Sequence, residues 1–168
     1  MPFRYARRVQ FAETDQAGIV HFSWYFRYME EAEHALWRAA GLSIASPDRP
    51  VLFPRVAASF EYLAPLHFED EFEVELVIES IGLRAIRYAC TISRAGTRIA
   101  TGSMTVAAAT KRPGEPLRGA NVPDDLAARL QAFLDVGSVQ SSGPKAEGST
   151  LEAQSWPVRT QHSRLTTD

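Results

Sequence analysis

The sequence predicts an α+β protein in which a largely antiparallel sheet wraps around one long helix. Between Phe22 and Gly41, large apolar side chains recur at steps of three and four residues, which is the period of a helix face. Between Val56 and Ala109, four strand-like runs follow one another, and the second alternates most clearly. Short glycine-containing segments separate the last three runs, as in the hairpins of an antiparallel sheet.

Composition excludes several classes of protein. The chain has 168 residues, a single-domain length, is 45% hydrophobic and has a formal net charge of −2. A nucleic-acid partner is disfavoured, because such proteins usually present a basic face. No apolar stretch is long enough to span a bilayer and no signal-peptide pattern is present, so we expect a soluble, cytoplasmic protein. The single cysteine, Cys90, excludes an internal disulfide and a cysteine-built metal site, and we expect it to be buried in a strand.

The first predicted elements are a strand, a turn and the long helix. Residues Tyr5–Phe11 alternate partly and end in turn chemistry, which predicts a short strand. The polar turn Ala12–Val20 follows, and the helix then continues to Gly41, a residue typical of helix ends. Three prolines between Leu42 and Pro54 predict a connecting loop.

Four strands are predicted in the middle of the chain. Their ranges are Val56–Leu63, Phe68–Ile81, Arg84–Ser93 and Arg98–Ala109. In the second strand, glutamates at alternate positions predict one buried face and one face that is solvated or paired. This acidic row is not expected to bind a metal, because no histidine accompanies it at ligand spacing.

The C-terminal part contains a loop, a short helix and a polar segment. Lys111–Asn121 is rich in proline and glycine, and a helix is expected after Pro123, since proline is tolerated in a first helical turn. From residue 137 onward few apolar residues occur, so we expect a folded domain of residues 1–137 and a disordered tail, 138–168. Trp156 in this tail is either an incidental side chain or a short docking motif.

The turn before the long helix holds the candidate chemistry. Fingerprints of serine hydrolases, P-loop proteins, zincins and dinucleotide-binding proteins are absent from the sequence. Asp15 lies at the entrance of a helix, where unpaired backbone N–H groups favour negative charge. A carboxylate beside such N–H groups is suited to acyl transfer to water, as general base or nucleophile. Alternatively, Asp15 only caps or shapes the loop.

The segment VQFAETDQAGIVHFSWYFRYMEEA resembles the signature of the 4-hydroxybenzoyl-CoA thioesterase family in the hot-dog superfamily, which includes acyl-CoA thioesterases of the Tol–Pal-linked type. Residues that match the signature are Asp15, Ala17, Gly18, Ile19, Val20, Phe22 and Tyr25, followed by Glu30, Glu31 and Ala32. The resemblance implies a hot-dog fold and hydrolysis of an acyl-CoA or acyl-carrier thioester, a reaction that needs no cofactor and no metal. It also implies a homodimer or homotetramer with the site at the subunit interface.

The resemblance further implies roles for five residues of this segment. Asp15 is the catalytic carboxylate, and the backbone N–H of Phe22 polarises the thioester carbonyl. Gly18 permits the tight turn and close approach of the substrate, while His21 and Tyr25 line the site. Some family members have a histidine at the position of Phe22, whereas this chain has His21 one residue earlier.

Two other functions stay open at this point. One is an acyl-thioester hydratase or dehydratase on the same fold, which would use an Asp15–His21 pair for proton transfer. The other is a non-catalytic module that binds acyl thioesters. The candidates for binding the CoA phosphates are Arg55, Arg84, Arg87 and Lys111.

Overall fold

The computed structural model describes residues 1–46, 49–112 and 114–134. The predicted tail, 138–168, with Trp156, lies outside these residues. The elements are β1 (Phe3–Arg8), η1 (Phe11–Glu13), α1 (Trp24–Ala39), β2 (Val51–Leu52), β3 (Arg55–Tyr62), β4 (Glu71–Ile81), β5 (Ala85–Arg94), β6 (Thr97–Ala107), β7 (Ala109–Thr110), β8 (Arg118–Gly119), α2 (Asp124–Leu130) and η2 (Gln131–Phe133).

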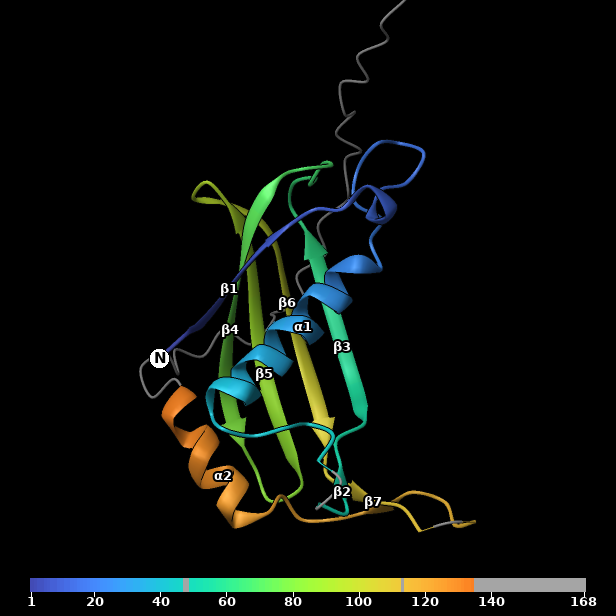
Figure 1. Ribbon diagram of the computed structural model, residues 1–168, viewed down its shortest axis with the longest axis vertical. Coiled ribbons are helices and arrows are strands. Elements are labelled where there is room, and N and C mark those ends of the chain that lie inside the picture. Colours follow the sequence, from blue (N-terminus) through green and yellow to red (C-terminus); the bar gives the residue numbers. More distant parts are fainter. Residues whose placement is uncertain (47–48, 113, 135–168) are drawn as a thin grey trace, which may run out of the picture. The chain divides into compact units, whose positions relative to one another are not determined.

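The main sheet has five strands in the order β1-β4-β5-β6-β3, and every neighbouring pair is antiparallel. Helix α1 lies across one face of this sheet (Figure 1). A second, small sheet joins β2, β7 and β8. The predicted α+β architecture, one long helix against a curved antiparallel sheet, is therefore confirmed.

The hairpins follow the sequence, but the place of β3 does not. The turn between β5 and β6 has Ala95 and Gly96 at φ +47° and +78°, as a tight hairpin turn requires. Strand β3 pairs with β6 instead of with its sequence neighbour β4. It therefore forms one edge of the sheet, and nearly all of its residues are exposed.

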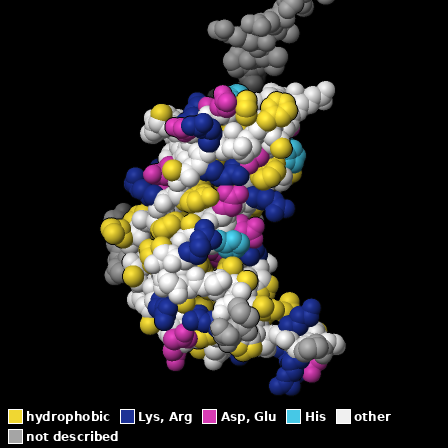
Figure 2. Space-filling view, viewed as in Figure 1, with side chains coloured by type: hydrophobic (Ala, Val, Ile, Leu, Met, Phe, Trp, Pro, Cys, Tyr) yellow, Lys and Arg dark blue, Asp and Glu magenta, His cyan; other side chains and the backbone are white. Residues whose placement is uncertain are grey.

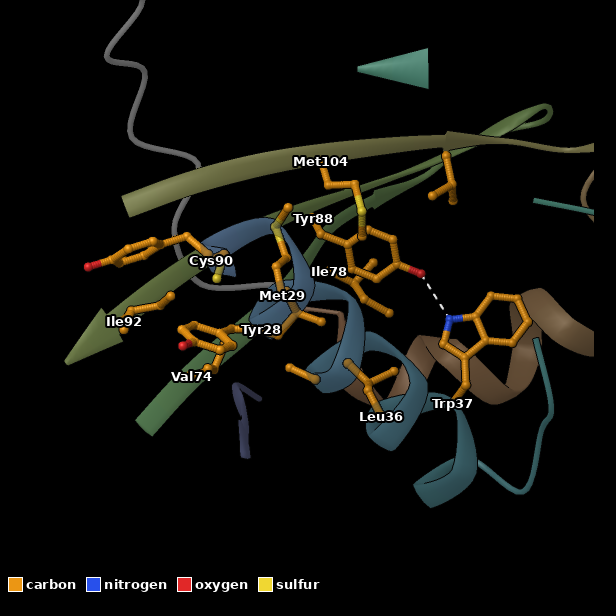
Figure 3. Packing of buried hydrophobic residues seen from close by; sticks show 14 of the residues in the cluster. Tyr28, Met29, Leu36, Trp37, Val74, Ile78, Tyr88, Cys90, Ile92 and Met104 are labelled. Carbon is orange, nitrogen blue, oxygen red and sulfur yellow. Dashed lines mark hydrogen bonds between the residues drawn. The ribbon is translucent and has the colours of Figure 1, made fainter. Parts of the chain in front are cut away.

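The core lies between α1 and the sheet. The α1 residues Met29, Leu36 and Trp37 are buried against side chains from β4, β5 and β6 (Figure 3). The Trp37 Nε1–H donates to the Tyr88 hydroxyl at 3.0 Å, so the indole has its hydrogen-bond partner inside the core (Figure 3). Cys90 is buried in β5 as predicted, and burial raises the pKa of its thiol to about 12.

The acidic row of β4 is paired with β1. Arg4 lies 3.2 Å from Glu73 and 3.1 Å from Glu75, and Arg8 pairs with Glu71. These exposed ion pairs connect two antiparallel neighbours, which agrees with the predicted solvated or paired face.

Several predicted boundaries are wrong. The first strand ends at Arg8, because the next residues turn into η1. The segment 68–70 is a turn before β4, since Asp70 N–H donates to the His67 carbonyl at 3.1 Å and Glu69 has φ +68°. The last predicted strand is split into β6 and β7, and the two predicted loops contain the short strands β2 and β8.

None of the helices in the part of the chain that the structure describes has the length and hydropathy of a membrane span.

Candidate active site

The residues between β1 and α1 form a closed loop, 14–20, here called the acid loop. Thr14 and Val20 pair as an antiparallel bridge at its base, and the Asp15 N–H donates to the Ile19 carbonyl at 2.9 Å. The Gly18 N–H donates to the Asp15 carbonyl at 2.9 Å, and Gly18 has φ +75°. A Cβ at Gly18 would meet no atom within 4 Å, so a larger side chain would fit in the space. Glycine is favoured here because of its positive φ.

The Asp15 side chain is exposed and only partly engaged. Its Oδ1 accepts a hydrogen bond from the Ala17 N–H at 2.8 Å, which is the loop-shaping contact that aspartate commonly makes in turns. Its Oδ2 makes no hydrogen bond with any residue that the structure describes. One oxygen thus holds the loop and the other is open to a substrate or water.

Directly before the N-cap of α1, the backbone has an N–H group without an acceptor among the described residues. The His21 carbonyl accepts the Trp24 N–H at 3.0 Å, and Ser23 is the helix N-cap. The Phe22 N–H donates to no acceptor among the described residues, and its ring is 59% exposed. Such an N–H at a helix start is an electrostatically favourable place for a carbonyl oxygen that gains negative charge.

His21 is oriented by Ser23. Its Nδ1 lies 2.8 Å from the Ser23 hydroxyl, and the Ser23 N–H also points to Nδ1 at 3.4 Å. Since that N–H can only donate, Nδ1 acts as an acceptor and the ring hydrogen belongs on Nε2. His21 makes no hydrogen bond to Asp15 among the described contacts.

Tyr25 is a core residue beneath this surface. It is 3% exposed, and burial raises the pKa of its hydroxyl. Its ring packs edge-to-face on Tyr62 from β3, with the ring centroids 5.0 Å apart. Tyr62, which the sequence did not single out, donates its hydroxyl hydrogen to the Phe22 carbonyl at 3.2 Å. Its only signal in the sequence is an aromatic at the end of an alternating strand.

A buried carboxylate lies directly before the acid loop. Glu13 is 3% exposed and accepts hydrogen bonds from the Arg7 guanidinium, the Gln10 N–H and the Tyr28 hydroxyl. Burial alone would raise the pKa of Glu13, but these three donors outweigh it and lower the pKa overall. Glu13 is therefore a fixed negative charge beneath the loop.

A hollow of about 420 Å³ runs beside α1 from the point where the helix begins. Its walls are formed by one face of α1 and by residues of β3 and β6. Its lining residues are Ser23, Phe26, Arg27, Met29, Glu30, Arg55, Ala58 and Met104. At the β3 side, Arg55 lies 3.0 Å from Glu30 and 2.5 Å from Glu33, so its charge is balanced by carboxylates.

The four predicted phosphate-binding cations differ in their surroundings. Arg84, Arg87 and Lys111 are exposed, and Arg55 is engaged in the hollow. Figure 2 shows basic and acidic side chains interspersed on the face that α1 covers, without a single basic patch. No group of three potential metal ligands occurs among residues 1–46, 49–112 and 114–134.

Comparisons with known proteins agree with the predicted family. The model of a family described as the thioesterase-like superfamily matches residues 9–130. A 1,4-dihydroxy-2-naphthoyl-CoA hydrolase from Synechococcus sp. (strain RCC307) is 30% identical over 135 residues, which are 75% of this chain and 98% of that protein. A relative from Aquifex aeolicus with a provisional esterase name is 46% identical over 82 residues, 48% of this chain and 64% of its own length. The match thus spans less than two thirds of that relative.

Solved structures confirm the hot-dog fold. The crystal structure of an Aquifex aeolicus protein matches with a TM-score of 0.72 at 31% identity, covering 77% of this chain and 99% of that one. A gentisyl-coenzyme A thioesterase matches with a TM-score of 0.67 at 26% identity, covering 75% of this chain and 98% of that one.

Proposed function

This chain belongs to the thioesterase-like superfamily, and from that membership we propose that it hydrolyses an acyl-CoA thioester to a free acid and a thiol. One observation carries the proposal. The acid loop offers a carboxylate with an open oxygen at Asp15, and two residues after this loop the Phe22 N–H has no acceptor among the described residues. Enzymatic hydrolysis of a thioester uses a group that attacks the carbonyl carbon, or activates water to do so, and a donor that stabilises the oxyanion.

In the proposed reaction, the Phe22 N–H donates to the thioester carbonyl oxygen. Asp15 either removes a proton from the water that attacks the carbonyl carbon, or attacks that carbon itself to form an anhydride that water then cleaves. In both routes the C–S bond breaks, and the sulfur leaves as a thiolate that takes up a proton. Three further residues surround the proposed reacting groups. Gly18 forms the turn of the acid loop, His21 is held by its contact with Ser23, and Tyr25 packs on Tyr62 in the core.

We propose an aromatic acyl group as the substrate class. The relatives named above act, by their names, on dihydroxynaphthoyl-CoA and gentisyl-CoA. The hollow beside α1 supports the same choice, because its lining includes Ser23, which follows Phe22 in the sequence, and the apolar side chains of Phe26, Met29 and Met104. An acyl group held there would keep its carbonyl near the helix start. No cofactor or metal enters this proposal.

We also propose a homodimer, which could pair further into a homotetramer. Strand β3 is an edge strand with exposed Val56 and Tyr62, and Leu63 directly after it is exposed as well. Long exposed edges are usually covered, and an antiparallel pair of identical edges closes with two-fold symmetry. The site then lies at the interface, because Tyr62 on that edge contacts Phe22.

The alternatives receive less support. A hydratase would need a proton-transfer pair, and His21 bonds to Ser23, not to Asp15, among the described contacts. Only a measurement of thioester hydrolysis distinguishes a non-catalytic binding module from an enzyme.

The test measures thiol release from aromatic, short-chain and long-chain acyl-CoAs by wild type and Asp15→Asn. We expect aromatic substrates to be hydrolysed fastest and kcat of the variant to fall by about 100-fold or more, as for removal of a reacting group. Asp124→Asn is the matched control, because Asp124 is exposed on α2. No thiol release by wild type would refute the thioesterase, and full activity of Asp15→Asn would refute the role of Asp15.

A further inference from the structure

We propose that Glu13 is a positioning residue for this reaction: its buried carboxylate and its backbone carbonyl together fix the acid loop against the start of α1. The inference rests on the proposed function and gives a role to a residue of the acidic segment that lies beneath the open site. Of the residues that the structure describes, only Glu13 and Glu33 are buried charged side chains.

The Glu13 carboxylate is fully engaged. Its Oε2 accepts hydrogen bonds from Tyr28 Oη at 2.7 Å, Arg7 Nη1 at 2.8 Å and the Gln10 N–H at 2.9 Å. Its Oε1 lies 2.6 Å from Arg7 Nη2, so the guanidinium binds both oxygens in a fork. The Arg7 guanidinium also lies 4.6 Å from the centre of the Tyr28 ring, which holds it over that ring.

These donors come from three different places in the chain. Arg7 belongs to β1, Gln10 is the N-cap residue before η1, and Tyr28 is in the second turn of α1, among the core side chains of Figure 3. One carboxylate therefore connects the strand before the acid loop to the helix after it.

The backbone of Glu13 completes this connection. Its carbonyl accepts the His21 N–H at 2.9 Å, directly below the bridge between Thr14 and Val20. Glu13 thus pairs with the last residue before Phe22, while Asp15 lies two residues after Glu13. This pairing ties the segment that leads into Asp15 to the residue that precedes Phe22, and it adds to the bridge between Thr14 and Val20.

Replacing the carboxylate by an amide would disturb this geometry without removing volume. A glutamine at position 13 turns one acceptor oxygen into an NH₂ group that faces donors such as the Arg7 guanidinium. The loop base would shift to relieve that clash of donors. Since a misplacement of about 1 Å can cost about 100-fold in rate, the chemical step should suffer more than binding.

A matched control lies in the same network. Glu31 accepts a hydrogen bond from Arg7 Nε at 2.6 Å and one from Tyr5 Oη at 3.4 Å, but it forms no hydrogen bond with the acid loop among the described residues. Glu31→Gln therefore removes a carboxylate partner of Arg7 without touching the base of the loop. The experiment compares kcat, KM, melting temperature and amide exchange at His21 in wild type, Glu13→Gln and Glu31→Gln.

We expect Glu13→Gln to lower kcat by about 10- to 100-fold with KM nearly unchanged, and to speed exchange of the His21 amide. Glu31→Gln should keep kcat within about twofold of wild type, even if it lowers the melting temperature as much as Glu13→Gln does. Unchanged kcat in Glu13→Gln, or equal losses in both variants, would overturn the inference while the thioesterase stands. If wild type hydrolyses no acyl-CoA, the proposed function falls and this inference falls with it.

Should Glu13→Gln not fold, Tyr28→Phe decides the question, because it removes only the hydroxyl that donates to Glu13. Lowered kcat with unchanged KM and faster His21 exchange supports the positioning role. Unchanged kcat in a folded Tyr28→Phe protein overturns it.

Discussion

Substitution of Glu33 by glutamine should change how stability depends on pH. The Glu33 side chain is fully buried on α1, where its Oε2 lies 2.5 Å from Arg55 Nη2. Its Oε1 makes no hydrogen bond of good geometry among the described residues. Burial raises the pKa of Glu33 from its usual 4.5 to about 7, although Arg55 and the Tyr88 hydroxyl act to lower it.

The sign of the effect follows from this raised pKa. The folded protein holds the proton on Glu33 more tightly than the unfolded chain does, so the stabilisation is fully present below pH 4.5 and is lost as the pH rises through about 7. The difference between the two pKa values corresponds to about 3 kcal/mol in the free energy of unfolding. A glutamine cannot ionise, so Glu33→Gln should lack this dependence.

The assay is urea unfolding followed by circular dichroism, at one protein concentration, at about pH 5 and about pH 8.5. Between these values wild type should lose about 2 to 3 kcal/mol more than Glu33→Gln does. Glu30→Gln is the control, because Glu30 also pairs with Arg55 but is partly exposed. Equal pH dependence in wild type and Glu33→Gln would refute the reasoning, as would an equal effect in the control.

Two further predictions concern β3. Gly102→Ala on β6 should lower the free energy of unfolding by about 1 to 3 kcal/mol, because its Cβ would lie 2.5 Å from the Ser59 carbonyl oxygen and 2.7 Å from the Phe60 ring of β3. Thermal or urea unfolding measures this loss, and Gly119→Ala, with open space around its Cβ, is the control. A Gly102→Ala protein as stable as wild type would contradict the packing. Val56→Lys should weaken the proposed homodimer by placing a charge on the exposed edge strand β3. Sedimentation should show more monomer for this variant than for the control Leu83→Lys, which changes an exposed position outside β3. An unchanged monomer–dimer equilibrium in Val56→Lys would contradict pairing through this edge.

The sequence predicted those features that depend on local patterns. The spacing of Met29, Leu36 and Trp37 predicted the buried face of α1, and Gly96 predicted the hairpin turn. The resemblance predicted the family, which the comparisons confirm. The roles of Asp15 and Phe22 stay predictions.

Features that depend on distant pairing were not predictable in this way. Nothing in the alternation of β3 says that it pairs with β6 and leaves an edge exposed. Likewise, a glutamate is usually exposed, so the burial of Glu13 is visible only once Arg7 and Tyr28 are brought to it by β1 and α1. Tyr62 was missed for the same reason, since its contact with Phe22 spans 40 residues.

In the proposed homodimer, the hydrogen bond from Tyr62 to the Phe22 carbonyl would link catalysis to protein concentration. Tyr62 lies on the edge that would join two subunits, and it holds the residue whose N–H would bind the carbonyl oxygen. If the edge loses its partner on dilution, that residue loses part of its support. Activity per molecule should then decline below the dimer dissociation constant, so rates measured at nanomolar enzyme would understate the rate of the assembled protein.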